Sequence, residues 1–172
     1  MTTHPPSQAP QPAFGYSLQE ARMLYYLLIA DGDDQVAYEV WDDVVVIKKD
    51  GHIVEQVAQR ESNPLTDNSP KPWHTIATWV KHSQRNPYNP QKAKFILFVL
   101  QNHPMGKILA LFHEADDDAK AEKALLSLRE HFWGTAPDYS KRGRIPASKK
   151  ADLETILNAD QQGRQGVFQV DR

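Results

Sequence analysis

Two neighbouring aspartates and a glutamine are spaced as a metal site would require. Asp42 and Asp43 precede a β-branched run, and Gln56 lies in the next apolar segment, beyond the hairpin signal Asp50-Gly51. An antiparallel hairpin would bring Gln56 beside the start of the first run. Carboxylate and carbonyl oxygens are the hard ligands that Mg²⁺ prefers, and the bound metal activates water for phosphodiester hydrolysis.

Position 58 bears on whether such a site could be catalytic. It lies two residues after Gln56 on the same expected strand, so the two side chains share a face. A lysine here would orient the attacking water or neutralise developing charge, but the residue is Ala58, which has neither charge nor donor. Glu39 lies within the preceding expected strand, where a buried carboxylate would be costly without a metal or cation.

These residues also have a purely structural interpretation. Asp42 and Asp43 could be solvated turn residues, and Gln56 alone would be a polar residue of an edge strand. Their mutual spacing, and that to position 58, favours a site. Trp73 and Trp79 are expected to be core or interface anchors rather than platforms for stacking bases.

Apolar periodicity predicts the elements that position these residues. Helices are expected over 17–30, 73–82, 107–115 and 116–131, with a short one around 153–157, and strands over 35–40, 43–49, 52–59 and 94–101. The first helix is expected to open on the capping box Ser17-Leu18-Gln19-Glu20. This order predicts an α/β sandwich with a mixed central sheet.

Composition excludes several classes of protein. The 172 residues suffice for one domain with a core, and the absence of cysteine excludes disulfides and cysteine-ligated zinc and fits a cytoplasmic location. No segment has the long apolar run of a membrane span, and the polar, proline-rich start lacks the apolar region of a secretory signal. The net charge of −2 lacks the basic excess frequent in DNA-binding proteins, although local basic patches can contact phosphates.

The ordered set of short motifs resembles the Q-x-K variant of the PD-(D/E)XK nuclease superfamily. More closely, it resembles the double-stranded-DNA endonuclease domain of CBASS anti-phage effectors, with related domains in Lamassu and HerA-associated defence systems. The shared features are an early helix with Gln19, E-x-x-D-D before an apolar strand, D-G followed by Q-V-x, an L-T-D loop, a tryptophan-containing helix and the strand F-I-L-F-V-L. The resemblance covers about residues 14–132.

The resemblance implies a restriction-endonuclease-like fold, with a mixed central sheet flanked by helices. It implies a nuclease domain over residues 14–160, between a disordered arm over 1–13 and a tail over 161–172 that could lead to a further region. The implied cofactor is Mg²⁺ or Mn²⁺, and the implied substrate is double-stranded DNA.

The resemblance also assigns roles to individual residues. Asp43 matches the metal-binding aspartate, with Asp42 as the alternative register, and Gln56 matches the second site residue. Glu39 and Gln19 match positions that often line the pocket. Ala58 occupies the position of the catalytic lysine, so the chain is expected to cut poorly or not at all.

Two explanations of the alanine are open: an engineered inactivating substitution, or a natural pseudo-nuclease that serves as a non-catalytic subunit for oligomerisation or docking in a defence complex. The resemblance implies a homo-oligomer on activation, and an activating partner that is a cyclic-oligonucleotide sensor, an SMC-like ATPase or a HerA-type ATPase. No membrane partner is expected. Lys141, Arg142 and Arg144 could follow a DNA backbone, or could equally form a solvated connector.

Overall fold

The chain folds into an α/β structure with a mixed sheet flanked by helices, as the sequence predicts. The computed structural model describes residues 11–40, 42–58, 62–85 and 89–159. The elements, including two short 3₁₀ turns (η), are α1 (Gln11–Ile29), β1 (Gln35–Tyr38), β2 (Val44–Lys48), β3 (Gly51–Ala58), α2 (Pro70–Gln84), η1 (Pro90–Lys92), β4 (Ala93–Val99), α3 (Lys107–His113), α4 (Asp118–Phe132), η2 (Arg142–Arg144) and α5 (Ala147–Ala159).

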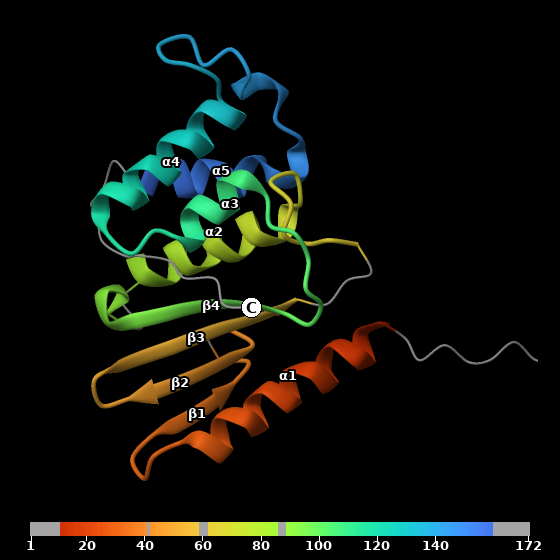
Figure 1. The fold of residues 1–172 in the computed structure, drawn as a ribbon, viewed down its shortest axis with the longest axis vertical. Coiled ribbons are helices and arrows are strands. Elements are labelled where there is room, and N and C mark those ends of the chain that lie inside the picture. Colours follow the sequence, from red (N-terminus) through yellow and green to blue (C-terminus); the bar gives the residue numbers. More distant parts are fainter. Residues whose placement is uncertain (1–10, 41, 59–61, 86–88, 160–172) are drawn as a thin grey trace, which may run out of the picture.

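The sheet has the strand order β1-β2-β3-β4 (Figure 1). The first three strands form an antiparallel meander, in which Tyr38 pairs with Val44, and Val44 pairs in turn with Glu55. Strand β4 runs parallel to β3 and pairs Val99 with Ala58. A parallel pair needs a crossover connection, and α2 provides it.

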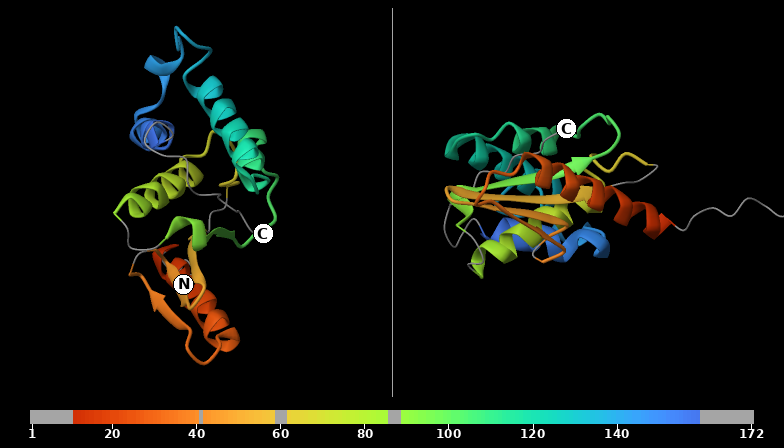
Figure 2. Two further views of the ribbon diagram at one scale, coloured as in Figure 1. Left: turned by 90° about the vertical axis from the view of Figure 1, so that its left-hand side faces the viewer. Right: turned by 90° about the horizontal axis from the view of Figure 1, so that it is seen from below.

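The helices cover both faces of the sheet. Helix α1 packs along β1 to β3 on one face, and α2 packs against β4 from the other side. Helix α5 lies beside α2 and α3 lies beside α4, and these helices stack beyond β4 (Figures 1 and 2). Side chains of β2 alternate between the faces. Val44 and Val46 pack with Tyr26 of α1, whereas Val45 belongs to the larger core beneath α2.

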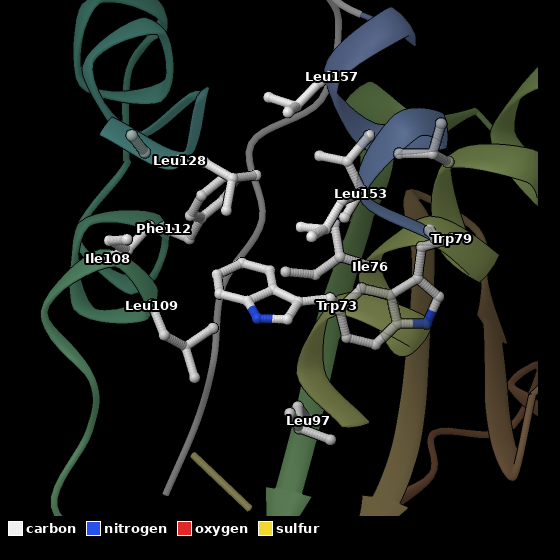
Figure 3. Packing of buried hydrophobic residues seen from close by; sticks show 14 of the residues in the cluster. Trp73, Ile76, Trp79, Leu97, Ile108, Leu109, Phe112, Leu128, Leu153 and Leu157 are labelled. Carbon is white, nitrogen blue, oxygen red and sulfur yellow. The ribbon is translucent and has the colours of Figure 1, made fainter. Parts of the chain in front are cut away.

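The larger core is built around two tryptophans of α2. Trp73 and Trp79 are both fully buried, which confirms their expected role as core anchors. Figure 3 shows them among apolar side chains from β4, α3, α4 and α5. The expected L-T-D loop supports the same core, because the Asp67 side chain accepts the backbone N–H groups of Ile108 and Leu109 at the start of α3.

Three helices begin earlier than the sequence analysis predicted, one of them being α5, which begins at Ala147 rather than near residue 153. The other two are α1 and α2. Helix α1 begins at Gln11, so the Ser17–Glu20 pattern lies inside the helix, the capping-box prediction is wrong, and residues 11–13 are helical rather than part of a disordered arm. Helix α2 begins at Pro70, within an expected loop. In both cases prolines occupy the first turn, where their missing N–H group has no helical partner to lose.

The β2–β3 hairpin forms as expected, but its turn differs from the prediction. Lys48 pairs with Gly51, so the two turn residues are Lys49 and Asp50, and Gly51 is the first residue of β3. A side chain at Gly51 would overlap the backbone carbonyl of Lys92 in η1. Glycine is therefore required for close approach between two backbones.

A buried ion pair fixes α1 to the sheet. The Arg22 guanidinium donates to both carboxylate oxygens of Glu55, at 2.6 and 2.7 Å, and the Tyr26 hydroxyl donates to the same carboxylate at 2.6 Å. Glu55 is completely buried. The guanidinium also lies 4.2 Å from the centre of the Phe98 ring on β4. Glu55 is thus a buried charge whose compensation comes from one helix.

Substitution of Arg22 tests this dependence. We expect Arg22→Met to lower the free energy of unfolding by about 3–5 kcal/mol, because it leaves the Glu55 carboxylate buried without its counter-charge. Adding Glu55→Gln should restore much of the loss, since the amide is neutral and still accepts from Tyr26. Urea unfolding of both variants measures the coupling.

The exposed pair between Lys120 and Asp116 of the α4 region provides the control. Lys120→Met should leave the free energy of unfolding nearly unchanged, because an exposed ion pair is screened by solvent. Equal losses for Arg22→Met and Lys120→Met would contradict a special role for the buried pair.

Candidate functional site

Asp43 and Gln56 meet at the end of the sheet, as the sequence analysis predicts. The pairing of Val44 with Glu55, continued by one residue, places Asp43 opposite Gln56. The Gln56 side-chain amide donates to Asp43 Oδ2, and the backbone N–H of Val57 donates to the same oxygen at 2.7 Å. Both bonds end on the same carboxylate oxygen, Oδ2.

Asp42 has a different environment, because a core tryptophan holds it. Its Oδ2 accepts the indole N–H of Trp79 at 2.5 Å, and its Oδ1 accepts the backbone N–H of Asp43 at 3.0 Å. Burial raises the pKa of Asp42 to about 7, assisted by the negative charge of Asp43 and opposed by the bond from Trp79 and by the charge of Lys71. Near neutral pH, Asp42 therefore exchanges between its acid and its carboxylate form.

Position 58 lies on the same face as Gln56 but inside the core. Ala58 is the last residue of β3, is only 3% exposed, and belongs to the same apolar cluster as Val54 and Trp79. Because the alanine side chain is a single uncharged methyl group, position 58 contributes no charge beside Gln56. A lysine here would have to run its methylene chain along apolar neighbours and carry its ammonium to the end of the sheet.

The structure does not bring Gln19 and Glu39 into contact with Asp43 through their side chains. Gln19 accepts a hydrogen bond from the Tyr38 hydroxyl at 3.1 Å, under α1 on the opposite face of the sheet. Glu39 is not in a strand interior, since β1 ends at Tyr38, and it is exposed with a φ of 52°. The prediction that Glu39 lies in a strand interior is therefore wrong, because the chain turns there between β1 and β2, and the exposed carboxylate gives the site no support.

Tyr38 is a neighbour of the site that the sequence analysis missed. Burial raises the pKa of its hydroxyl, and the negative charges of Glu39, Glu20 and Asp43 raise it further. The Tyr38 phenol thus experiences the negative charges of Glu39, Glu20 and Asp43 together. No spacing rule indicates this, because Glu20 belongs to a helix and reaches the phenol only through tertiary packing.

The expected basic residues lie away from the aspartates. Lys141, Arg142 and Arg144 are exposed around η2, which lies beyond the helical layer from the β1–β2 edge of the sheet (Figure 1). The Arg142 guanidinium lies 4.3 Å from the Trp133 ring centre and 3.9 Å from a Glu154 oxygen. These contacts favour the connector interpretation over a path for DNA that reaches the sheet end.

The oxygen donors at the sheet end can be compared with what a divalent cation needs. Asp43 Oδ1, a carboxylate oxygen of Asp42 and, after rotation of its amide, Oε1 of Gln56 are hard donors of the type that suits Mg²⁺ or Mn²⁺. Among the described residues there is no cluster of three or more histidine, cysteine, aspartate or glutamate side chains placed to bind a metal. A cation at the sheet end would therefore have to take most of its ligands from water.

Comparison with known proteins provides no relative for this chain. No protein-family model, no curated protein and no solved structure matches it. Within the described ranges, no helix is both long and apolar enough to cross a membrane. Inferences about function therefore depend on the site itself.

The raised pKa of Asp42 predicts a pH-dependent stability. The folded chain binds more protons than the unfolded chain between about pH 4 and pH 7, so stability should fall as pH rises through this window and level off above it. Asp42→Asn should remove this component, worth up to about 4 kcal/mol. Urea unfolding at several pH values between about 5 and 8 measures it.

Asp138→Asn, at an exposed position, is the matched control and should keep the pH dependence of the unaltered chain. If Asp42→Asn kept it as well, the proton uptake would belong to another group.

Proposed function

We propose that the chain is a PD-(D/E)XK-type nuclease domain with a restriction-endonuclease-like fold, built to hydrolyse double-stranded DNA with Mg²⁺ or Mn²⁺ and inactive with alanine at position 58. The observation that carries the proposal is the contact of Asp43 with Gln56 across the β2–β3 hairpin, two residues before position 58 on the same face. The element order is compatible with it, because the hairpin is followed by the tryptophan-containing α2 and the F-I-L-F-V-L strand β4, the order of motifs on which the resemblance rests.

In this proposal each residue at the sheet end has a defined task. Asp43 Oδ1 and Gln56 Oε1 bind the cation, while the backbone N–H of Val57 holds the Asp43 carboxylate in place through Oδ2. When bound, the cation polarises the scissile phosphate and lowers the pKa of its water ligand. Asp42 contributes a second carboxylate in its ionised form, so cation binding should strengthen as pH rises through about 7.

The role of position 58 follows from what an ammonium group would add there. A positive charge beside Gln56 would orient water and stabilise the charge that develops on the phosphate, and removing one such group typically costs a factor of 10²–10³ in rate. Alanine supplies neither effect. The proposal therefore assigns cation and DNA binding to the present chain, with little or no cutting.

A non-catalytic interaction subunit that keeps the nuclease fold is the second candidate. The observation that favours it is the close apolar packing around Ala58, which is 3% exposed within the main core. In this alternative, position 58 serves stability alone, and the chain acts in oligomerisation or docking within a defence complex.

Restoring a lysine separates the two candidates. We expect Ala58→Lys to degrade supercoiled plasmid in the presence of Mg²⁺ but not of EDTA, at least about a hundredfold faster than the unaltered chain. Ala58→Met, which matches the length of the lysine stem without its charge, should remain inactive. Gel electrophoresis of plasmid over time measures the rates.

Two further outcomes are informative. Adding Asp43→Asn to the lysine variant should abolish cutting if Asp43 holds the cation. Cutting by the unaltered chain would show that the catalytic centre lies elsewhere, and a folded lysine variant that fails to cut at any concentration would favour the interaction subunit.

A further inference from the structure

The outer face of α1 is an apolar surface with no partner in the described structure. Six of the nine large hydrophobic side chains that are exposed among the described residues belong to this helix. They are Tyr16, Leu24, Tyr25, Leu27, Leu28 and Ile29, with exposed fractions between 47% and 77%. We call this set the α1 face. Single exposed leucines are ordinary, but a continuous group on one helix marks an interaction surface.

The orientation of α1 explains why these apolar side chains are exposed. The helix buries Tyr26 and directs the Arg22 guanidinium toward the sheet, where Glu55 binds both, while its leucines point outward. Rotating the helix to bury the leucines would remove Arg22 from Glu55 and leave a carboxylate uncompensated in the core. The ion pair therefore fixes the apolar side of α1 outward, and only another surface can cover it.

The chemistry of the α1 face favours a second copy of the same surface as its occupant. Residues 23–30 contain no charged side chain, so two copies can meet there without bringing like charges together. Ala21, Leu24 and Leu28 follow each other at intervals of three and four residues, the spacing with which two helices pack side chains between one another. The part of the face from Leu24 to Ile29 is uncharged and therefore complementary to itself in a twofold arrangement, whereas the exposed Glu20 lies beside its N-terminal part.

The exposed apolar area is comparable with that of a small dimer interface. If each large side chain covers roughly 150–250 Å², six at about half exposure offer on the order of 500 Å² per copy and roughly 1,000 Å² when all are covered in two copies, which is about the lower limit of a specific interface. We propose that the α1 face is a homodimer interface in which α1 packs against α1 of a second copy. This proposal does not depend on nuclease activity.

Sedimentation velocity on the full chain tests the interface. The unaltered chain should change from monomer to dimer as its concentration is raised from the micromolar range upward. Leu28→Glu should weaken the dimer by at least about tenfold in dissociation constant, because the carboxylate would be desolvated between two apolar helices. Leu126→Glu is the matched control, since Leu126 is a 50% exposed leucine on α4, and it should dimerise like the unaltered chain.

Introduced cysteines provide a second measurement that does not weaken the interface. The chain contains no cysteine, so Leu28→Cys would carry a unique thiol. A short bis-maleimide should link two copies of Leu28→Cys efficiently and two copies of Leu126→Cys poorly. A chain that stays monomeric at every concentration would overturn the proposal. The proposal would also be overturned if Leu28→Glu left a dimer intact and both cysteine variants were linked equally. The contact between the two copies would then lie on another surface.

Discussion

The pairing register of β2 with β3 is the constraint on which the other features depend. Val44 lies opposite Glu55, so Asp43 lies opposite Gln56. The buried ion pair of Glu55 therefore lies on one face of the hairpin, and the contact of Gln56 with Asp43 lies on the other. A shift of one residue would direct every side chain of β3 to the other face. Glu55 would then enter the large core without Arg22, and Gln56 would lose Asp43. Both polar contacts therefore oppose the same shift.

The adjacent residues Glu55 and Gln56 divide two tasks between them. Glu55 points toward α1 and is fully buried, where it receives Arg22 and Tyr26. Gln56 points toward α2 and is only partly buried at the end of the sheet, in contact with Asp43. The first contact determines where α1 lies, and the second determines how the aspartate is presented. Since both residues belong to β3, the position of α1 and the position of the Asp43 carboxylate depend on the same strand.

Local patterns in the sequence predicted much of this structure, and tertiary contacts account for the rest. The continuous run of β4 predicted a strand covered on both faces, and Phe95, Ile96 and Leu97 are all buried. The spacing of Asp43 and Gln56 predicted their contact, because a hairpin fixes the partner of each residue. The bond from Trp79 to Asp42 could not be predicted, since it depends on how α2 crosses the sheet. Arg22 and Glu55 were missed for the same reason, being 33 residues apart in the chain.

Ala58 lies where the apolar core ends and the polar end of the sheet begins. Stability there favours a small apolar side chain, whereas the proposed chemistry beside Gln56 would favour a long cationic one. Under the proposed function, selection for stability and selection for catalysis would therefore act on the same position in opposite directions, a conflict that is common where active sites adjoin cores. Gain or loss of the proposed activity would then depend on a single side chain at the boundary of the core rather than on a redesign of the fold.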